Sequence, residues 1–390
     1  MNEQGYNFTE SEEILALRTS VRRFAKERIL PLARELDESE TFSLELTKEM
    51  GEMGFFGVLI PPEYGGQGLD YLSYIAIVEE LARIDSSQAA VVAVNNTLGA
   101  GSIYYFGTEE QKQNFLPGLC TGEGLWSFAL TEADSGSDAR SCKTTAVYDS
   151  TTKEWVINGS KIWISFSSTK ISKGITLQAV TGQTADKQPE LSCFLVPINT
   201  PGLAVKSMKG KMMWRATDTG ELYFQNMRLP AKSLLGEKGE GFNIMMKMLD
   251  RGRLSIGAIG LGLAQGAFDL ALEYAQYREA FGKKLCEHQA ITFKLSEMAT
   301  KIEAARNLLY KATWLRQNSL PSEKEAAMAK LFCSEVAEFC AREGQQIFGA
   351  YGLIKEYPIE RFYRDAALLR VGEGTSEILK MVIGKHICNA

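Results

Sequence analysis

Residues 155–164 read Trp-Val-Ile-Asn-Gly-Ser-Lys-Ile-Trp-Ile and place the dipeptide Asn158-Gly159 between two short apolar runs. An Asn-Gly pair in this setting favours a two-residue type I′ turn, so the stretch predicts a β-hairpin. Further strand patterns follow at 192–198 and 221–224, in a region rich in Gly, Ser and Thr. We therefore predict a compact antiparallel β domain here.

The chain has a helical pattern on both sides of this β region. Apolar residues recur at near-helical spacing from 10 to 120, apart from the Pro- and Gly-rich loop 61–68. Long amphipathic runs cover 241–277, 287–316 and 323–347. Runs of this length usually pack as an antiparallel bundle.

These patterns divide the chain into three domains. We expect a helical N-terminal domain over 1–120, the β domain over 121–235 and a C-terminal helical bundle over 236–390. The fold class is then α+β, mostly α. Strands and helices do not alternate along the chain, which argues against a doubly wound nucleotide-binding fold.

Composition excludes several classes of function. The 390 residues carry 43 basic and 48 acidic side chains, a net charge of -5, and no basic stripe, so nucleic acid is not an expected partner. Apolar runs stop short of the ~20 residues that a membrane span needs. The acidic, polar N-terminus resembles neither a signal peptide nor an Arg-rich transit peptide.

Histidine and cysteine usage argues against a metal centre. The chain has two histidines and seven scattered cysteines, without a C-x-x-C pair. Zinc and iron–sulfur sites need denser ligand sets, so no metal is expected. An odd number of cysteines without a framework indicates a reducing compartment.

The most informative motif is Glu373 between Gly372 and Gly374, followed by Thr375. Glycine lacks the Cβ that would keep a ligand away from the carboxylate. Thr375 is placed to cap a helix that begins near Ser376. The alternative interpretation is a capped loop-to-helix junction with an incidental glutamate.

Three other stretches have a functional and a plain interpretation. The turn at 131–138 is rich in hydroxyl and amide groups, which suits a polyanionic ligand or a simple polar turn. Arg278, before the Phe281-Gly282 turn, can hold a phosphate or cap a helix C-terminus. Trp163 and Ser165 lie on one side of a strand, as a cofactor platform or as part of the core.

Taken in order, these motifs resemble those of the acyl-CoA dehydrogenase family, over about residues 10–388. The resemblance rests on sequence at 62–66, 131–138, 163–165, 250–253, 278–289, 363–366 and 373–377. It implies an N-terminal helical domain, a middle β domain and a C-terminal four-helix bundle. It also implies FAD, bound between the β domain and the bundle, and a homotetramer in which a neighbouring subunit contacts part of the cofactor.

The resemblance assigns roles residue by residue. Glu373 is the implied base that removes the α-proton of an acyl thioester, while the β-hydrogen leaves as hydride to the flavin. The implied flavin contacts are Phe128, Leu130, Thr131, Trp163, Ser165, Arg278, Phe281, Gln289, Gln346, Gly349, Thr375 and Glu377. The implied contacts to the thioester ligand are Ser137, Asp250, Arg253, Gly372 and Gly374.

Departures from the family pattern bear on the substrate. Some relatives place the base before the arginine that matches Arg253, but here that position is Gly252. Most relatives carry Tyr where this chain has Gly372, so we expect room for a short, branched or cyclic acyl group. The alternative is that a neighbouring side chain refills the space. Asn95 and Asn96 are expected to shorten the acyl pocket or to bind a polar tail.

Other functions remain open at this stage. The thioester is carried by CoA or by an acyl-carrier protein. The electron acceptor is an electron-transferring flavoprotein, which we favour, or oxygen. A non-catalytic relative that acts as a binding or assembly factor is the distant alternative. The expected location is the bacterial cytoplasm or, for a eukaryotic chain, the mitochondrial matrix in mature form.

Overall fold

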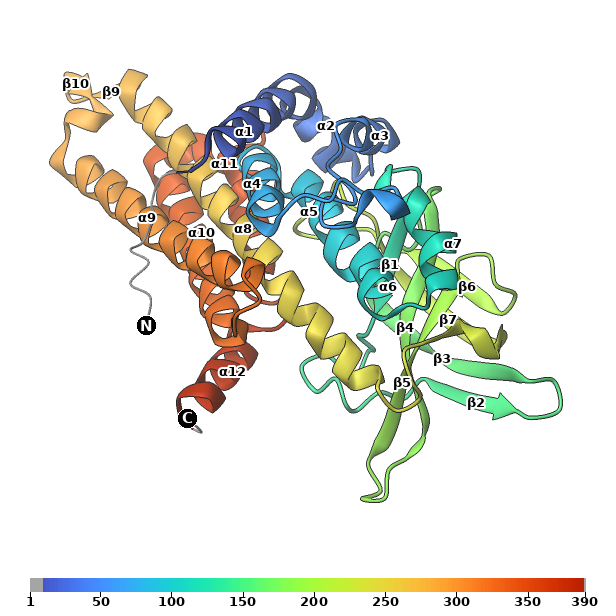
Figure 1. The fold of residues 1–390 in the computed structure, drawn as a ribbon. Coiled ribbons are helices and arrows are strands. Elements are labelled where there is room, and N and C mark those ends of the chain that lie inside the picture. The colour runs from blue at the N-terminus through green and yellow to red at the C-terminus, as the bar shows by residue number, and fades with distance from the viewer. Residues whose placement is uncertain (1–9, 389–390) are drawn as a thin grey trace.

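The computed structural model describes residues 10–388 and has helices at both ends of the chain and strands between them (Figure 1). The long helix α8 runs from the strands into the C-terminal helices. This arrangement confirms the predicted fold class.

The N-terminal helices begin at side-chain caps that the sequence supplies. Ser11, Ser43, Asp70, Asp85 and Thr108 each accept a hydrogen bond from a backbone N–H in the first turn of the following helix. The helices are α1 (Glu12–Phe24), α2 (Leu30–Ser39), α3 (Leu44–Glu52), α4 (Tyr71–Ala82), α5 (Ser86–Val94), α6 (Ala100–Phe106) and α7 (Glu109–Cys120). Single π-helical turns, Ala25–Ile29 and Asn95–Gly99, join α1 to α2 and α5 to α6.

The middle of the chain forms one eight-stranded sheet, in the order β6-β7-β3-β2-β4-β5-β8 with β1 paired to β4. Its strands are β1 (Leu125–Ala129), β2 (Thr145–Asp149), β3 (Glu154–Ser165), β4 (Ser172–Gln183), β5 (Pro189–Pro197), β6 (Leu203–Ser207), β7 (Thr219–Pro230) and β8 (Leu234–Leu235). Most neighbours are antiparallel, as predicted, but β4 runs parallel to β1 and to one residue of β2.

The predicted hairpin at Asn158-Gly159 is wrong, because β3 continues through both residues. Thr145 of β2 pairs with Asn158, and Phe224 of β7 pairs with Gly159. The register shifts between Ile157 and Gly159, so the Asn-Gly pair marks a bulge inside a strand. Pairing on both edges of β3 overrides the local turn preference.

Three C-terminal helices match the predicted amphipathic runs closely: α8 (Gly241–Tyr277), α9 (Gln289–Gln317) and α10 (Glu323–Phe348). Two shorter helices follow, α11 (Ile359–Leu369), which was not predicted, and α12 (Ser376–Cys388), which begins where predicted. A small hairpin of β9 (Glu279–Ala280) and β10 (Lys283–Lys284) joins α8 to α9. Helices α8, α9 and α10 pack on one another, and α11 and α12 pack on α10.

Helix α8 is the central element of this domain. By length and apolarity it is the one helix among residues 10–388 that would suit a membrane, but 78% of the relevant stretch is buried within the fold. A Cβ at Gly262 would lie 2.2 Å from the Glu79 carbonyl oxygen, and one at Gly260 would lie 2.9 Å from that of Cys333. Small residues therefore let the α8 backbone approach both α4 and α10.

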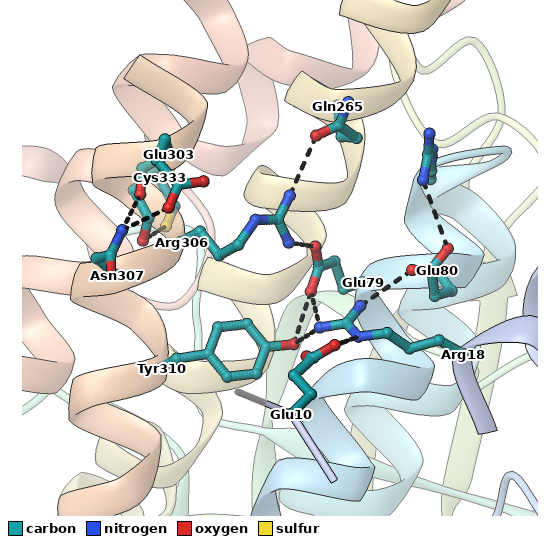
Figure 2. Close-up of polar contacts among 12 residues, drawn as sticks. Glu10, Arg18, Glu79, Glu80, Gln265, Glu303, Arg306, Asn307, Tyr310 and Cys333 are labelled. Atoms are coloured by element: carbon teal, nitrogen blue, oxygen red, sulfur yellow. Dashed lines mark hydrogen bonds and ion pairs between the residues drawn. The ribbon is translucent and has the colours of Figure 1, made fainter. Parts of the chain in front are cut away.

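A buried ionic network joins the N-terminal helices α1 and α4 to the C-terminal helix α9 (Figure 2). Arg18 of α1 donates to Glu79 (2.9 Å) and Glu80 (3.0 Å) of α4. Arg306 of α9 also donates to Glu79, as does the Tyr310 hydroxyl at 2.7 Å. Each buried charge thus has an opposite partner, as burial requires. The network fixes α1 and α4 against the helices that carry the site described below.

Candidate active site

Glu373 lies in the loop that joins α11 to α12. The N–H groups of Val371 and Gly372 both donate to the Leu368 carbonyl at 2.8 Å, which closes the end of α11. The next two residues have positive φ angles, 52° at Glu373 and 104° at Gly374. Such a conformation costs a non-glycine residue on the order of 1–3 kcal/mol and persists only where surrounding contacts impose it. We call residues 370–375 the base loop.

Helix α12 begins as the sequence predicts. Thr375 Oγ1 accepts a hydrogen bond from the Ile378 N–H at 3.3 Å, and the helix starts at Ser376. Glu377 lies exposed in the first turn. A hydrogen bond from its own N–H, followed by one from Thr375, lowers the pKa of Glu377. This carboxylate is therefore ionised at neutral pH beside the positive end of the helix.

The Glu373 carboxylate packs against the backbone of α8 at Gly252. A Cβ at position 252 would lie 2.0 Å from Glu373 Oε2 and 3.4 Å from Leu98 Cδ2. Only glycine leaves this space free. Gly252, the position where the sequence carries no alternative carboxylate, is thus the surface against which the Glu373 carboxylate packs.

Burial gives this carboxyl group unusual acid–base properties. It raises the pKa of Glu373 to about 7, against the opposing effects of the Lys330 and Arg253 cations. Within residues 10–388, Oε2 has no hydrogen-bond partner although it is buried. A carboxylate with a pKa near the working pH and a free lone pair is suited to accept a proton.

Asp250 and Arg253 lie on α8, within one turn of Gly252. Arg253 Nη1 donates to Asp250 Oδ1 at 3.3 Å, and Arg316 of α9 pairs with the other carboxylate oxygen. Arg253 is buried, and its Nε has no partner among the described residues. The structure therefore brings these two sequence-predicted residues together, and one of them retains a free donor near Glu373.

A second group of predicted residues lies where β1 meets β3. Lys161 of β3 donates to the Leu130 carbonyl at 2.9 Å and to Glu132 Oε1 at 2.8 Å. The Ile162 N–H donates to the Thr131 carbonyl at 3.0 Å. These bonds hold the chain after β1 against β3, which brings Leu130 and Thr131 next to the strand segment that carries Trp163.

Trp163 presents its ring to solvent. Its φ is 62°, at a register shift between Lys161 and Ile164, and 56% of the residue is exposed. An exposed tryptophan on a strained strand residue is an unusual use of a large apolar side chain. Phe128, Leu130, Thr131 and Ser165 are each partly exposed as well. Trp163 and these four side chains are therefore accessible to a ligand from solvent.

The remaining residues predicted to bind the cofactor lie at the far end of the helical domain. Arg278 directly follows α8, with its guanidinium carbon 5.8 Å from the Tyr351 ring centroid. Phe281 is 99% exposed in the β9–β10 hairpin, and Gln289 begins α9. Gln346 and Gly349 are exposed at the end of α10. Figure 1 shows this hairpin on the side of the molecule opposite β2 and β3. Within one chain, the β9–β10 hairpin is therefore separated from β3, the strand that carries Trp163.

Ser137 and the two glycines of the base loop complete the predicted set. Ser137 is exposed in a turn that Ser135 closes by donating to the Asp138 carbonyl at 2.7 Å. A Cβ at Gly372 would meet Leu368 at an ordinary 3.6 Å. The Gly374 carbonyl accepts a hydrogen bond from Lys330 Nζ at 2.7 Å. A surface hollow of about 170 Å³, lined by residues that include Arg34 and Glu356, contains none of the predicted site residues.

Sequence reasoning missed Lys330, which lies in α10 within a run of buried alanines. A lysine at an apolar helix position is the one signal that could have drawn attention to it. It also missed Lys161, which occupies an inward position of β3.

Models of one protein family match nearly the whole chain. The N-terminal, middle and C-terminal domains of acyl-CoA dehydrogenase match residues 11–123, 127–227 and 239–388. The chain belongs to the acyl-CoA dehydrogenase family, and it is an FAD-dependent oxidoreductase.

Individual relatives match over nearly the whole chain. The probable acyl-CoA dehydrogenase YngJ of Bacillus subtilis is 43% identical, over 98% of this chain and 99% of its own. The mitochondrial short-chain specific acyl-CoA dehydrogenase of Bos taurus is 42% identical, over 95% and 89%. The structure of butyryl-CoA dehydrogenase from Megasphaera elsdenii superimposes with a TM-score of 0.93 at 37% identity, covering 98% of this chain and 100% of that one.

Two further structures bear on the cofactor and on the thioester carrier. An acyl-CoA dehydrogenase from Bacillus anthracis, complexed with FAD, has a TM-score of 0.91 at 32% identity, over 97% of this chain and 67% of that one. The prolyl acyl carrier protein oxidase AnaB has a TM-score of 0.92 at 31% identity, over 97% and 100%.

Proposed function

We propose that the protein catalyses α,β-dehydrogenation of a short or branched acyl-CoA to the 2-enoyl-CoA, with Glu373 as the base. The observation that carries this proposal is the buried Glu373 carboxyl group, whose pKa is raised to about 7 and whose Oε2 has no partner within residues 10–388. A carboxylate paired in an ion pair would be a much weaker base.

The residues at the sheet fit FAD. The exposed Trp163 ring and the half-buried Phe128 and Leu130 offer an apolar surface for a flat ring system, and the Thr131 and Ser165 hydroxyls supply polar contacts at its edge. Bound FAD supplies the hydride acceptor for the β-hydrogen of the substrate. Thr375 and Glu377, at the start of α12, are the other residues that we propose to contact FAD.

Glu373 then acts twice in the dehydrogenation step, through its carboxylate and through its backbone N–H. Its carboxylate takes the α-proton, and a positioned base of this kind contributes roughly 10²–10⁴-fold to the rate. Its backbone N–H makes no hydrogen bond within residues 10–388 and is free to bind the thioester oxygen as charge develops there. The positive φ of Glu373 sets the direction of that N–H relative to its side chain.

The preference for a small acyl group rests on similarity to the short-chain specific acyl-CoA dehydrogenase of Bos taurus and to the butyryl-CoA dehydrogenase of Megasphaera elsdenii. A cavity of about 10 Å³, room for one water molecule, lies between Thr97, Gly101, Tyr105 and Met248, and Glu373 does not line it. The Asn95 amide bonds to Leu119 and Trp126 backbone atoms, and the Asn96 amide to those of Phe55, Val58 and Val92. Contrary to the sequence-based alternative, neither asparagine is free to bind a polar tail.

We propose a homotetramer in which a neighbouring subunit completes each cofactor site. Residues predicted for the distal part of FAD lie far from Trp163 in one chain and are exposed, with Phe281 at 99%. The proposed electron acceptor is an electron-transferring flavoprotein. Relatives in Bacillus subtilis and in mitochondria support a bacterial cytoplasmic or matrix location.

The test is anaerobic bleaching of the bound flavin by a panel of thioesters. Butyryl-CoA or isobutyryl-CoA is expected to bleach wild-type protein, whereas Glu373→Gln retains FAD and is not bleached. Bleaching only by carrier-protein thioesters would favour the alternative that AnaB represents. A protein that binds FAD but is reduced by none of them would contradict the proposed function.

A further inference from the structure

A buried lysine is directed at the base loop from the neighbouring helix α10. Lys330 is fully buried, and its Nζ donates to the Gly374 carbonyl at 2.7 Å. A buried ammonium group is costly and rarely retained unless it is paired. Lys330 lies 43 residues before Glu373 in the chain, but it contacts Gly374, the residue that directly follows Glu373.

The same face of α10 holds the other end of the loop. The Ser334 hydroxyl, one turn beyond Lys330, lies within hydrogen-bonding distance of two carbonyl groups, that of Leu369 at 2.9 Å and that of Lys330 at 2.7 Å, and its one proton is shared between them. Leu369 ends α11 and Gly374 precedes α12. Two side chains of α10 therefore contact carbonyl groups on both sides of the strained Glu373.

We propose that Lys330 is a positioning residue for the reaction: its ammonium group fixes the Gly374 carbonyl, and with it the orientation of Glu373, while its charge favours the carboxylate form of the base. This inference rests on the proposed function of Glu373 and adds a role in setting how basic that residue is. Without Lys330, the positive φ angles of Glu373 and Gly374 would lose one of the contacts that impose them.

The charged and titratable groups that face Glu373 come from three helices. Arg253 of α8 and Lys330 of α10 are cationic, and Tyr74 of α4 is buried and donates to the Ala93 carbonyl at 2.9 Å. Burial lowers the pKa of Lys330 to about 8, although the Glu373 charge opposes this effect. Lys330 is thus still cationic at neutral pH. Arg253 shares its charge with Asp250, which leaves Lys330 as the less neutralised of the two.

The decisive experiment is the pH profile of flavin reduction by butyryl-CoA in Lys330→Met holoenzyme. Removal of a cation beside a carboxylate raises the pKa of that carboxylate. The rising limb of the profile is therefore expected to move to higher pH by about one unit or more, and the plateau rate is expected to fall at unchanged FAD content. Lys330→Arg keeps the charge. It is expected to keep the midpoint of the rising limb of the pH profile but to lower the plateau rate of flavin reduction.

Two variants separate positioning from charge and from general stability. Ser334→Ala loosens the loop without changing charge, so its rate is expected to fall at an unchanged midpoint. Lys211→Met removes another buried lysine, which donates to the Thr217 carbonyl at 2.8 Å, and is expected to leave the midpoint where it is. If Lys330→Met does not fold, a midpoint shift in Lys330→Arg overturns the inference and a retained midpoint supports it.

A second readout keeps this test independent of turnover. The difference in proton uptake between wild type and Glu373→Gln reports the Glu373 pKa directly, and the same difference is measured in the Lys330→Met background. An unchanged pKa and an unchanged reduction rate in Lys330→Met would overturn the inference. If no thioester reduces wild-type flavin, the proposed function fails, and proton uptake still decides whether Lys330 acts on Glu373.

Discussion

Gly252 and Glu373 occupy complementary space: the carboxylate Oε2 lies where a Cβ at position 252 would come within 2.0 Å. A glycine in the interior of a long helix usually costs stability. Here it gives the base a place to rest against the backbone of α8.

Gly252→Ala is therefore expected to displace the Glu373 carboxylate. Misplacement of a reacting group by about 1 Å can cost on the order of 10²-fold in rate, and we expect a loss of this size in flavin reduction with FAD content retained. Gly257→Ala is the control, since its Cβ would meet Leu309 Cδ1 at 3.1 Å instead of the base. Equal rates in Gly252→Ala and wild type would show that the carboxylate does not need this position.

The rate of reduction is expected to depend on pH through Glu373. The base must be ionised, and burial raises its pKa to about 7, so kcat/KM should rise as the pH passes through this value. Stopped-flow reduction between mildly acid and mildly alkaline pH measures this. A profile already flat well below pH 7 would mean that the free enzyme carries an ordinary, exposed carboxylate.

The free energy of unfolding should fall as the pH rises, whereas the reduction rate should increase. The folded pKa of Glu373, about 7, lies above its ordinary value of 4.5. Its protonated form is thus favoured by folding, and stability that is fully present below pH 4.5 is lost as the pH rises through 7. Glu373→Gln is therefore expected to raise Tm relative to wild type at pH 8 and to have little effect at pH 5. An equal difference at both pH values would contradict this.

Gly372→Tyr is expected to shift preference from isobutyryl-CoA toward butyryl-CoA. The Cβ itself fits, at 3.6 Å from Leu368, so the added ring would fill the space beside the reacting carbons. Overpacking of this kind costs about 1–3 kcal/mol, or roughly 5- to 150-fold in kcat/KM. Gly372→Ala is the matched control, and an unchanged ratio in the tyrosine variant would show that Gly372 does not shape the pocket.

Arg278→Ala is expected to weaken FAD retention and the tetramer together, because the cofactor would bridge two subunits. Flavin absorbance after gel filtration and sedimentation velocity measure the two effects. Lys284→Ala, an exposed lysine of the same hairpin, should change neither. An Arg278→Ala protein that purifies yellow and tetrameric would contradict this assignment.

Local patterns were sufficient to predict the three long C-terminal helices and the start of α12, but not α11. The amphipathic run at 241–277 coincides with α8, and Thr375 caps α12 as its hydroxyl predicted. These features depend on residues within one or two turns of each other. Asn158-Gly159 was misread because its conformation depends on Thr145 and Phe224, far away in the chain.

The properties of the site likewise depend on residues that are distant in the chain. A carboxylate between two glycines was visible in the sequence, but its raised pKa and its contact with Gly252 depend on packing against α8. Lys330 carried no motif, since its partner carbonyl lies 44 residues further on. Sequence pointed to the group that we propose as the base, and only the fold showed what surrounds it.

The contact between Gly252 and Glu373 also constrains the evolutionary path of this enzyme. A glutamate acquired at position 252 would collide with the existing base and place two carboxylates in one site. With Glu373 as the proposed base, a variant that carries glutamate at 252 needs a smaller residue at 373. We therefore expect the two positions to be epistatic, with either single substitution giving a protein of low activity.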